Sequence, residues 1–180
     1  GHSEQFTIAS VSGTSVSVTT GAQYAHNGQL YSLGAVPARL GLDFQTAETR
    51  AAVALLTRSI RIVSEGDALD QPFPSGPGNF FGGHTIVRQG VAQYQIQGVE
   101  FYQLGQGGRK AHYPVHFHMA RQTPNDTFVM DSSVHDSMTR WYVVHAPQGV
   151  TFARNVGYLS IGHGYYIEDG SEINNRFLSN

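Results

Sequence analysis

The second half of the sequence is a series of short β-prone runs, most of them separated by Gly, Asn or Asp. The runs cover residues 84–87, 94–102, 115–119, 141–145, 150–152, 156–161 and 165–167. Three strings look like one repeated unit: Gly98-Val-Glu-Phe, Gly149-Val-Thr-Phe and Asn155-Val-Gly-Tyr. Short strands with polar corners that recur about every 20 residues are typical of a β-solenoid, whose coils stack on one another. The sequence therefore predicts an all-β fold, a parallel β-helix.

The composition agrees with this fold and excludes several classes of protein. The 180 residues suffice for one domain with a sizeable core, and the 21 glycines suit a chain with many turns. With a net charge of −2 and only 13% charged residues, the chain lacks the basic surface that nucleic-acid binding needs. No run approaches the length of a membrane-spanning helix. Because cysteine is absent, disulfides and thiolate chemistry are excluded.

Three segments before residue 84 carry signals of their own. Residues 6–11 and 15–19 alternate apolar and polar side chains around a Gly-Thr pair, which predicts a β-hairpin. Residues 46–63 are alanine-rich at first and β-branched later, and we interpret the whole run as strand. Residues 66–83 hold three prolines and five glycines, which predicts a loop within a single domain over residues 4–180. The opening residues 1–3 read as a remnant of an expression vector.

Histidines stand in two of the predicted strands. His116 and His118 are two residues apart, so on a strand their side chains point to the same face. The interval from His118 to His145 and the interval from His145 to Glu168 are similar, and each is close to one coil of a β-helix. If the coils stack, these side chains form a ladder on one face of the β-helix.

Such a ladder has the chemistry of a metal site. Imidazole and carboxylate ligands suit zinc, nickel or another divalent transition ion, and calcium is a further candidate. The predicted ligands are His116, His118, His145, Glu168 and His163, and His84 is an additional ligand or substrate contact. A ladder of hydrogen-bonded histidines without an ion is the alternative interpretation. A cupin barrel also uses His-x-His, but it needs a glutamate a few residues later, and residues 119–125 contain none.

Several carboxylates are candidates for catalysis, because cleavage of a glycosidic bond usually needs two carboxyl groups. We consider Glu168, Glu100 and Asp169 for this role. Since adjacent strand residues face opposite sides, at most one of Glu168 and Asp169 is expected to reach the site. The alternative for Asp169-Gly170 is a plain turn.

A lyase mechanism would use other groups. Elimination from a uronate needs a group that neutralises the carboxylate, and Arg140, His135 or a metal ion could supply it. A histidine or tyrosine would then take the proton. The alternative for Arg140 is a salt bridge to Asp136.

Aromatic residues are adjacent in two runs, Trp141-Tyr142 and Tyr165-Tyr166. Neighbours on a flat strand cannot both point inward, so one residue of each pair should face outward. Outward aromatic side chains on stacked coils make a platform for sugar rings, while stacking within the fold is the alternative.

An ordered set of strings resembles the family of cell-migration-inducing hyaluronan-binding proteins and the related transmembrane cell-surface hyaluronidase. The strings are Ala54-Leu-Leu-Thr-Arg-Ser-Ile, Gly82-Gly-His84, Gly98-Val-Glu-Phe, Leu104-Gly-Gln106, Tyr113-Pro-Val-His-Phe-His118, Ser133-Val-His135, Arg140, Val144-His145, Asn155-Val156, Gly162-His163, Glu168-Asp-Gly170 and Asn174. They run in the family's order over most of the chain. The resemblance implies a right-handed parallel β-helix that binds or acts on hyaluronan outside the cell.

These features predict an extracellular or secreted protein that cleaves or binds glycans containing uronic acid at a histidine-rich metal site; a periplasmic location stays open. We expect a hyaluronidase-like hydrolase. A polysaccharide lyase and a non-catalytic carbohydrate-binding module with a structural ion are the alternatives. The predicted partner is an acidic polysaccharide such as hyaluronan, and no nucleic acid or membrane span is expected.

Overall fold

The computed structural model describes residues 2–34, 46–64 and 81–180. The chain divides into two compact units, Gly1–Val53 and Ala54–Asn180, where the sequence suggested one domain over residues 4–180. Most of the loop predicted at residues 66–83 lies outside the described residues. Strands, turns and irregular segments make up the described residues, which include no helix and therefore none that could span a membrane. The prediction of an all-β chain is confirmed.

The amino-terminal unit consists of two small antiparallel pairs. Strands β1 (Ile8–Ser12) and β2 (Ser15–Val18) form the predicted hairpin, which is confirmed. Strands β3 (Tyr31–Ser32) and β4 (Thr46–Ala47) pair over two residues each. The side chains of β1 and β2 are exposed along their whole length, so this unit has little core of its own.

The prediction of one continuous strand over residues 46–63 is wrong in its middle. Only β4 and β5 (Ile60–Val63) are strands, and residues 48–59 form neither strand nor helix. Val53 is 98% exposed. A strand needs a ladder partner for its backbone groups. β5 pairs with β7, but residues 48–59 pair with no strand in the described part of the chain.

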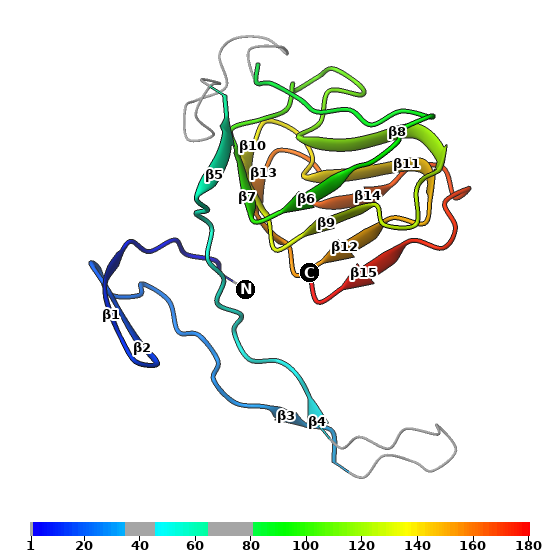
Figure 1. Cartoon of the computed structure of the whole chain (residues 1–180). Coiled ribbons are helices and arrows are strands. Elements are labelled where there is room, and N and C mark those ends of the chain that lie inside the picture. The colour runs from blue at the N-terminus through cyan, green and yellow to red at the C-terminus, as the bar shows by residue number, and fades with distance from the viewer. Residues whose placement is uncertain (1, 35–45, 65–80) are drawn as a thin grey trace. The chain divides into compact units, whose positions relative to one another are not determined.

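Three parallel sheets build the carboxyl-terminal unit (Figure 1). The chain passes through them in a constant order. Its strands are β6 (Gln95–Gln97), β7 (Val99–Tyr102), β8 (Val115–Gln122), β9 (Phe128–Met130), β10 (Ser133–Ser137), β11 (Tyr142–Gln148), β12 (Thr151–Ala153), β13 (Val156–Ser160), β14 (Tyr165–Ile167) and β15 (Arg176–Leu178). The sheets are β6-β9-β12-β15, β5-β7-β10-β13 and β8-β11-β14. Every third strand from β6 onward therefore returns to the same sheet, and three successive strands, one in each sheet, make one round.

The corner that follows each strand of the sheet β6-β9-β12-β15 repeats one backbone conformation. Gly98, Asp131, Arg154 and Ser179 all have positive φ, between 51° and 66°. The amide of Gly98 donates to the Met130 carbonyl (3.1 Å), and the amides of Asp131 and Arg154 make the corresponding bonds one and two rounds later (2.9 Å each). The stacked corners thus satisfy their backbone donors by hydrogen bonds between rounds.

The three similar strings do not mark one repeated unit, and the rounds are not uniform in length. Among the stacked corners, Gly98 occupies the position equivalent to Arg154, and not the position equivalent to Asn155. Gly149 precedes β12, which belongs to a different sheet. Phe101 pairs with Val134 and Val134 pairs with Gly157, so the first of these two rounds is the longer one. The difference arises because the connections between strands vary in length. The interval expected from the sequence was too short for both rounds.

The space between the three sheets is filled by apolar side chains. Phe101, Phe117, Val144 and Phe152 are completely buried there. Phe152 stacks on Phe177 of the next round, with ring centroids 5.1 Å apart. Each fully buried side chain of this kind contributes about 1.5–3 kcal/mol to the free energy of unfolding. This core holds the sheet β8-β11-β14 in place, and the candidate site lies on that sheet's outer side.

Candidate functional site

Along the strands of the sheet β8-β11-β14, successive side chains point alternately into the core and to the outer face. Phe117 points into the core, so His116 and His118 on either side of it point outward. The register places His118 beside His145 and His116 beside Val143. The expected stacking of His118 and His145 is therefore present.

Three histidines converge on this outer face. The rings of His118 and His145 are 5.1 Å apart at their centroids, and their Nδ1 atoms are 3.4 Å apart. The ring of His116 lies 5.0 Å from that of His118. One nitrogen from each of the three imidazoles lies within 4.8 Å of the others. The three side chains can therefore contact a single small ligand at the same time.

The most buried member of this group has an unused nitrogen. His116 is completely buried, and its Nδ1 lies 3.1 Å from the Ala111 carbonyl. Its Nε2 has no hydrogen-bond partner among the described residues. Burial, together with the charges of His118, His145 and His84, lowers the pKa of His116 to about 4. His116 is thus a neutral imidazole at neutral pH, with Nδ1 donating to the carbonyl and Nε2 offering its lone pair.

His118 is also held in the neutral form. Burial lowers its pKa first, and the charges of His145 and Arg88 lower it further, against a smaller opposite effect of Glu168. Neutral imidazole is the form that binds metal ions. Two imidazole nitrogens on one tetrahedral zinc ion lie about 3.3 Å apart. The 3.4 Å between the Nδ1 atoms of His118 and His145 agrees with that separation. The donor set and its spacing therefore fit a transition-metal ion.

Both carboxylates after β14 approach His145, which corrects the expectation that only one could. An oxygen of Glu168 lies 3.8 Å from Nδ1 of His145, and an oxygen of Asp169 lies 3.4 Å from Nε2. Strand β14 ends at Ile167, so strand alternation no longer applies to the next two residues. Asp169 also accepts hydrogen bonds from the amide and hydroxyl of Ser171, which lower its pKa. It is therefore both a turn residue and a neighbour of the histidines.

Next to the histidines, the Arg140 side chain packs against two tyrosine rings. The guanidinium carbon of Arg140 lies 3.6 Å from the ring centroid of Tyr166 and 4.9 Å from that of Tyr113. Arg140 also donates to the Tyr113 hydroxyl (3.0 Å), and the Tyr113 ring contacts that of His116 (4.9 Å). The described residues show no ion pair between Arg140 and Asp136, since Asp136 pairs with His135 (2.7 Å).

His163 does not join the three histidines that could share an ion. Its ring stacks on Tyr166, with centroids 5.3 Å apart, and it is exposed. His84 packs edge-on against His112 (4.4 Å), and it lies near enough to His116 to affect its pKa. Both residues therefore flank the site.

Glu100 and His135 lie on a different sheet. Glu100 on β7 is completely buried and bonds to Nη2 of Arg61 (2.9 Å), the amide of Arg58 (3.0 Å) and Nε2 of His135 (3.2 Å). Burial alone would raise the pKa of Glu100, but the hydrogen bonds and charge of Arg61 and the Arg58 amide outweigh it and lower the pKa. The structure thus separates this pair from the histidines of β8 and β11.

In each of the two aromatic pairs, one side chain packs in or against the core between the sheets, and in the first pair the second side chain, Trp141, packs against that core as well. Tyr142 is completely buried and stacks on Tyr165 of the next round, with centroids 4.8 Å apart. Trp141 and Tyr166 are half-buried. The indole of Trp141 lies against Gly157, and its Nε1 donates to the Leu159 carbonyl (3.1 Å). Trp141 therefore packs within the unit, and Tyr166 is the aromatic neighbour of the arginine.

Some residues near the site were not found from the sequence. Glu172 accepts the amide of Ala146 (3.0 Å) just after His145, and Arg88 and Arg121 lie beside His118 in a small pocket. Glu172 and Arg88 lie in connections, and Arg121 lies near the end of β8. Isolated charged residues of this kind form no recognisable sequence pattern, so only their position in space reveals them.

Residues 80–180 match the family described as CEMIP beta-helix. The chain belongs to this family. The resemblance inferred from the ordered strings is thereby confirmed. Among the relatives is the cell migration-inducing and hyaluronan-binding protein of Mus musculus, 32% identical over 149 residues, which cover 77% of this chain and 11% of the relative. No solved structure matches the chain.

Two relatives from Dictyostelium discoideum extend the comparison. A G8 domain-containing protein is 36% identical over 177 residues, which are 98% of this chain and 10% of the relative. Communication mutant protein F is 40% identical over 137 residues, or 76% of this chain and 11% of the relative. The chain thus spans about a tenth of the length of the curated relatives it matches.

Proposed function

We propose that this chain is a segment of a secreted or cell-surface protein that cleaves an acidic polysaccharide of the hyaluronan type at its histidine cluster. Its three sheets would be the sides of a right-handed parallel β-helix, with the cluster on one outer face. The observation that carries the proposal is the convergence of His116, His118 and His145 with an unpartnered, buried Nε2 on His116. The name of the mouse relative supports hyaluronan as the glycan.

A divalent ion held by these three imidazoles would polarise a bound water or neutralise a uronate carboxylate. Zinc or nickel fits the nitrogen ligands best, and calcium fits them least because it prefers oxygen. Glu168 is the carboxylate proposed to move the proton, since it is partly exposed beside His145. Asp169, on the other ring nitrogen of His145, would orient that imidazole.

Arg140 is the proposed contact for a sugar carboxylate. Its guanidinium group takes part in no ion pair among the described residues, so its charge is available to a ligand. Tyr166, which packs on Arg140 and stacks on His163, holds the guanidinium group in position for this contact. The arginine and the histidines are linked through Tyr113, so one bound chain can reach both.

Two alternatives have observations of their own. The contact between Arg140 and Tyr166 also suits a lyase, in which arginine neutralises the uronate and tyrosine takes the proton. A non-catalytic binding module with a structural ion is favoured by the hydrogen bonds that already engage Asp169 in a turn. In that case Glu168 would be only a neighbour of the ion.

The deciding experiment incubates the tag-free chain with hyaluronan, chondroitin and alginate, with and without a chelator. New reducing ends indicate hydrolysis, and the absorbance of an unsaturated uronate indicates a lyase. Binding without chain shortening indicates the module. Metal analysis of the same samples should show one ion per chain in the unsubstituted protein and a loss of most of it in His118→Ala and His145→Ala. A protein that takes up neither zinc nor nickel nor calcium at neutral pH would contradict the proposed site.

Glu168→Gln separates catalysis from binding. This substitution keeps the size of the side chain and removes its proton transfer, so cleavage should fall by about 100-fold or more while glycan affinity changes little. Asp126→Asn is the control, because Asp126 is a carboxylate that bonds to Gln95 and does not approach His145. Full activity of Glu168→Gln, together with histidine variants that lose only thermal stability, would favour the binding module.

A further inference from the structure

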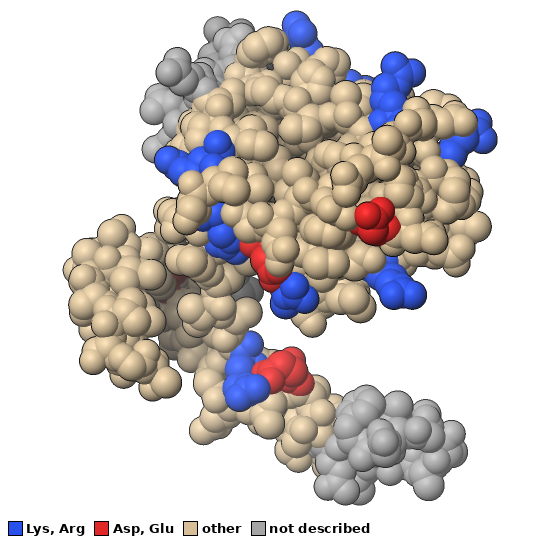
Figure 2. Space-filling view, viewed as in Figure 1, with Lys and Arg blue, Asp and Glu red and all other residues tan. Residues whose placement is uncertain are grey.

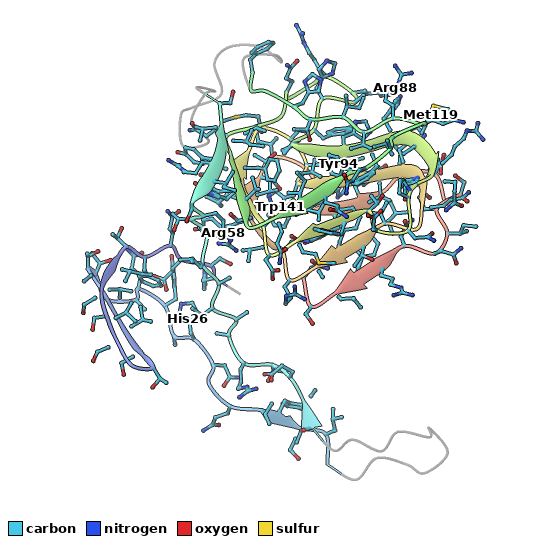
Figure 3. The ribbon with its side chains drawn as sticks, viewed as in Figure 1. His26, Arg58, Arg88, Tyr94, Met119 and Trp141 are labelled. Atoms are coloured by element: carbon cyan, nitrogen blue, oxygen red, sulfur yellow. The ribbon has the colours of Figure 1, made fainter. Side chains whose placement is uncertain are left out.

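A pocket of about 420 Å³ opens beside His118 at the carboxyl end of β8. It is lined by Arg88, Gln89, His118, Met119 and Arg121. Figure 3 shows Arg88 and Met119 next to each other at this end of the strand. His118 is shared between this pocket and the histidine cluster, so a ligand at the cluster has direct access to the two arginines.

The pocket exists because β8 contains a bulge. His118 pairs with His145, but Arg121 pairs with Pro147, so β8 has one residue more than β11 between these two pairs. Met119 and Arg121 have φ angles of 49° and 55°, while the residue between them is completely buried. Bulges re-aim side chains, and backbone strain of this kind persists where the surrounding structure enforces it. Here the bulge places the side chains of Met119 and Arg121 on the pocket wall.

The wall of this pocket is positive. Its lining contains two guanidinium groups and no carboxylate. Neither Arg88 nor Arg121 takes part in an ion pair in the part of the chain that the structure describes. Arg88 is close enough to His118 for its charge to contribute to the lowered pKa of that histidine. In the view of Figure 2, Lys and Arg side chains project from this unit at more places than Asp and Glu side chains do.

The opposite side of the histidine cluster is negative, since Glu168 and Asp169 both approach His145. An anionic group on a bound sugar is repelled there and attracted toward the arginines. Guanidinium groups bind oxyanions through paired, charge-assisted hydrogen bonds. This difference in charge between the two sides of the cluster therefore places a further charged group of the glycan in the pocket and gives the bound glycan one direction.

We propose that Arg88 and Arg121 form an anion subsite, which binds an oxyanion group of a second charged sugar in the same glycan chain that occupies the histidines. The inference rests on the proposed function, because it names a second contact of the same glycan. The anionic group is a carboxylate or a sulfate ester, which share this chemistry. The subsite is distinct from Arg140, which lies at the start of β11 and contacts Tyr166.

The test is the affinity of the tag-free chain for three defined oligosaccharides. Hyaluronan oligosaccharides carry only carboxylates, keratan sulfate oligosaccharides carry only sulfates, and chitin oligosaccharides are neutral. In the double variant Arg88→Gln/Arg121→Gln, Kd for the acidic ligand should rise about tenfold or more, which is about 1.4 kcal/mol. Kd for the chitin oligosaccharide should not change. The acidic oligosaccharide that loses affinity identifies the anion.

Three controls separate this inference from the proposed function. Arg176→Gln, an exposed arginine on β15, should leave all affinities unchanged. Arg88→Lys/Arg121→Lys should restore part of the loss, and the metal content of every variant should equal that of the unsubstituted chain. Unchanged binding of acidic oligosaccharides by the double Gln variant overturns the subsite while the proposed function stands. No binding of any acidic glycan by the unsubstituted chain overturns both.

Discussion

Replacing Gly157 by alanine tests how the site is held in place. A methyl group at this position would lie 2.0 Å from Cε3 of Trp141 and 2.4 Å from two further indole atoms. Carbon atoms in contact are about 3.5–4.0 Å apart, so the indole has to move by about 1.5–2 Å. Trp141 directly precedes β11, which carries His145, so this displacement acts on the sheet of the candidate site.

The expected loss of stability follows from two contacts. Overpacking of this kind lowers the free energy of unfolding by about 1–3 kcal/mol. Loss of the bond from Trp141 Nε1 to the Leu159 carbonyl adds about 0.5–1.5 kcal/mol. Alanine has fewer conformations than glycine in the unfolded chain, and this difference offsets about 0.4–1 kcal/mol of the lost stability. The net loss is therefore about 0.5–4 kcal/mol.

Urea unfolding followed by tryptophan fluorescence measures this effect directly, because Trp141 is the only tryptophan in the chain. The midpoint for Gly157→Ala should fall, and the emission of the folded protein should shift to longer wavelength as the indole meets water. Gly83→Ala is the matched control: no atom lies within 4 Å of the added methyl group, so its stability should stay unchanged or rise slightly. Equal midpoints and equal spectra for Gly157→Ala and the unsubstituted chain would refute the packing described for Trp141.

Two further predictions concern buried polar groups. The pKa of Glu100 is lowered in the folded chain from its ordinary value of 4.5, so its ionised form stabilises the fold above that value and this contribution is lost as the pH falls. Glu100→Gln should therefore lower the free energy of unfolding by about 1–3 kcal/mol at pH 7, and the difference should shrink in urea titrations repeated from pH 6 down to pH 3. Asn155 accepts the Ser132 amide (3.1 Å) and donates to the Val129 carbonyl (2.8 Å), so Asn155→Ala should cost about 1–3 kcal/mol for each partner left unpaired. An Asn155→Ala chain with an unchanged urea midpoint would contradict that role.

Local features of this protein could be read from its sequence, because they depend on neighbours along the chain. Alternation around Phe117 placed His116 and His118 on one face, and a Gly-Thr turn between alternating runs marked the hairpin of β1 and β2. The interval between His118 and His145 also matched one round of the true register. The amino-acid sequence alone was therefore enough to identify the three histidines of the candidate site.

Other assignments depended on how the rounds stack, which residue spacing does not determine. Glu100 and His135 belong to another sheet because the connections between strands differ in length. Asp169 reaches His145 because β14 ends one residue before Glu168, and Arg121 lines the pocket because β8 has one residue more than β11. A strand end or a single inserted residue changes the side on which a side chain lies, and hydrogen bonding to the neighbouring strand decides both. That partner is distant in sequence, so only the tertiary structure shows that Asp169 joins Glu168 beside His145 and that Arg121 lines the pocket.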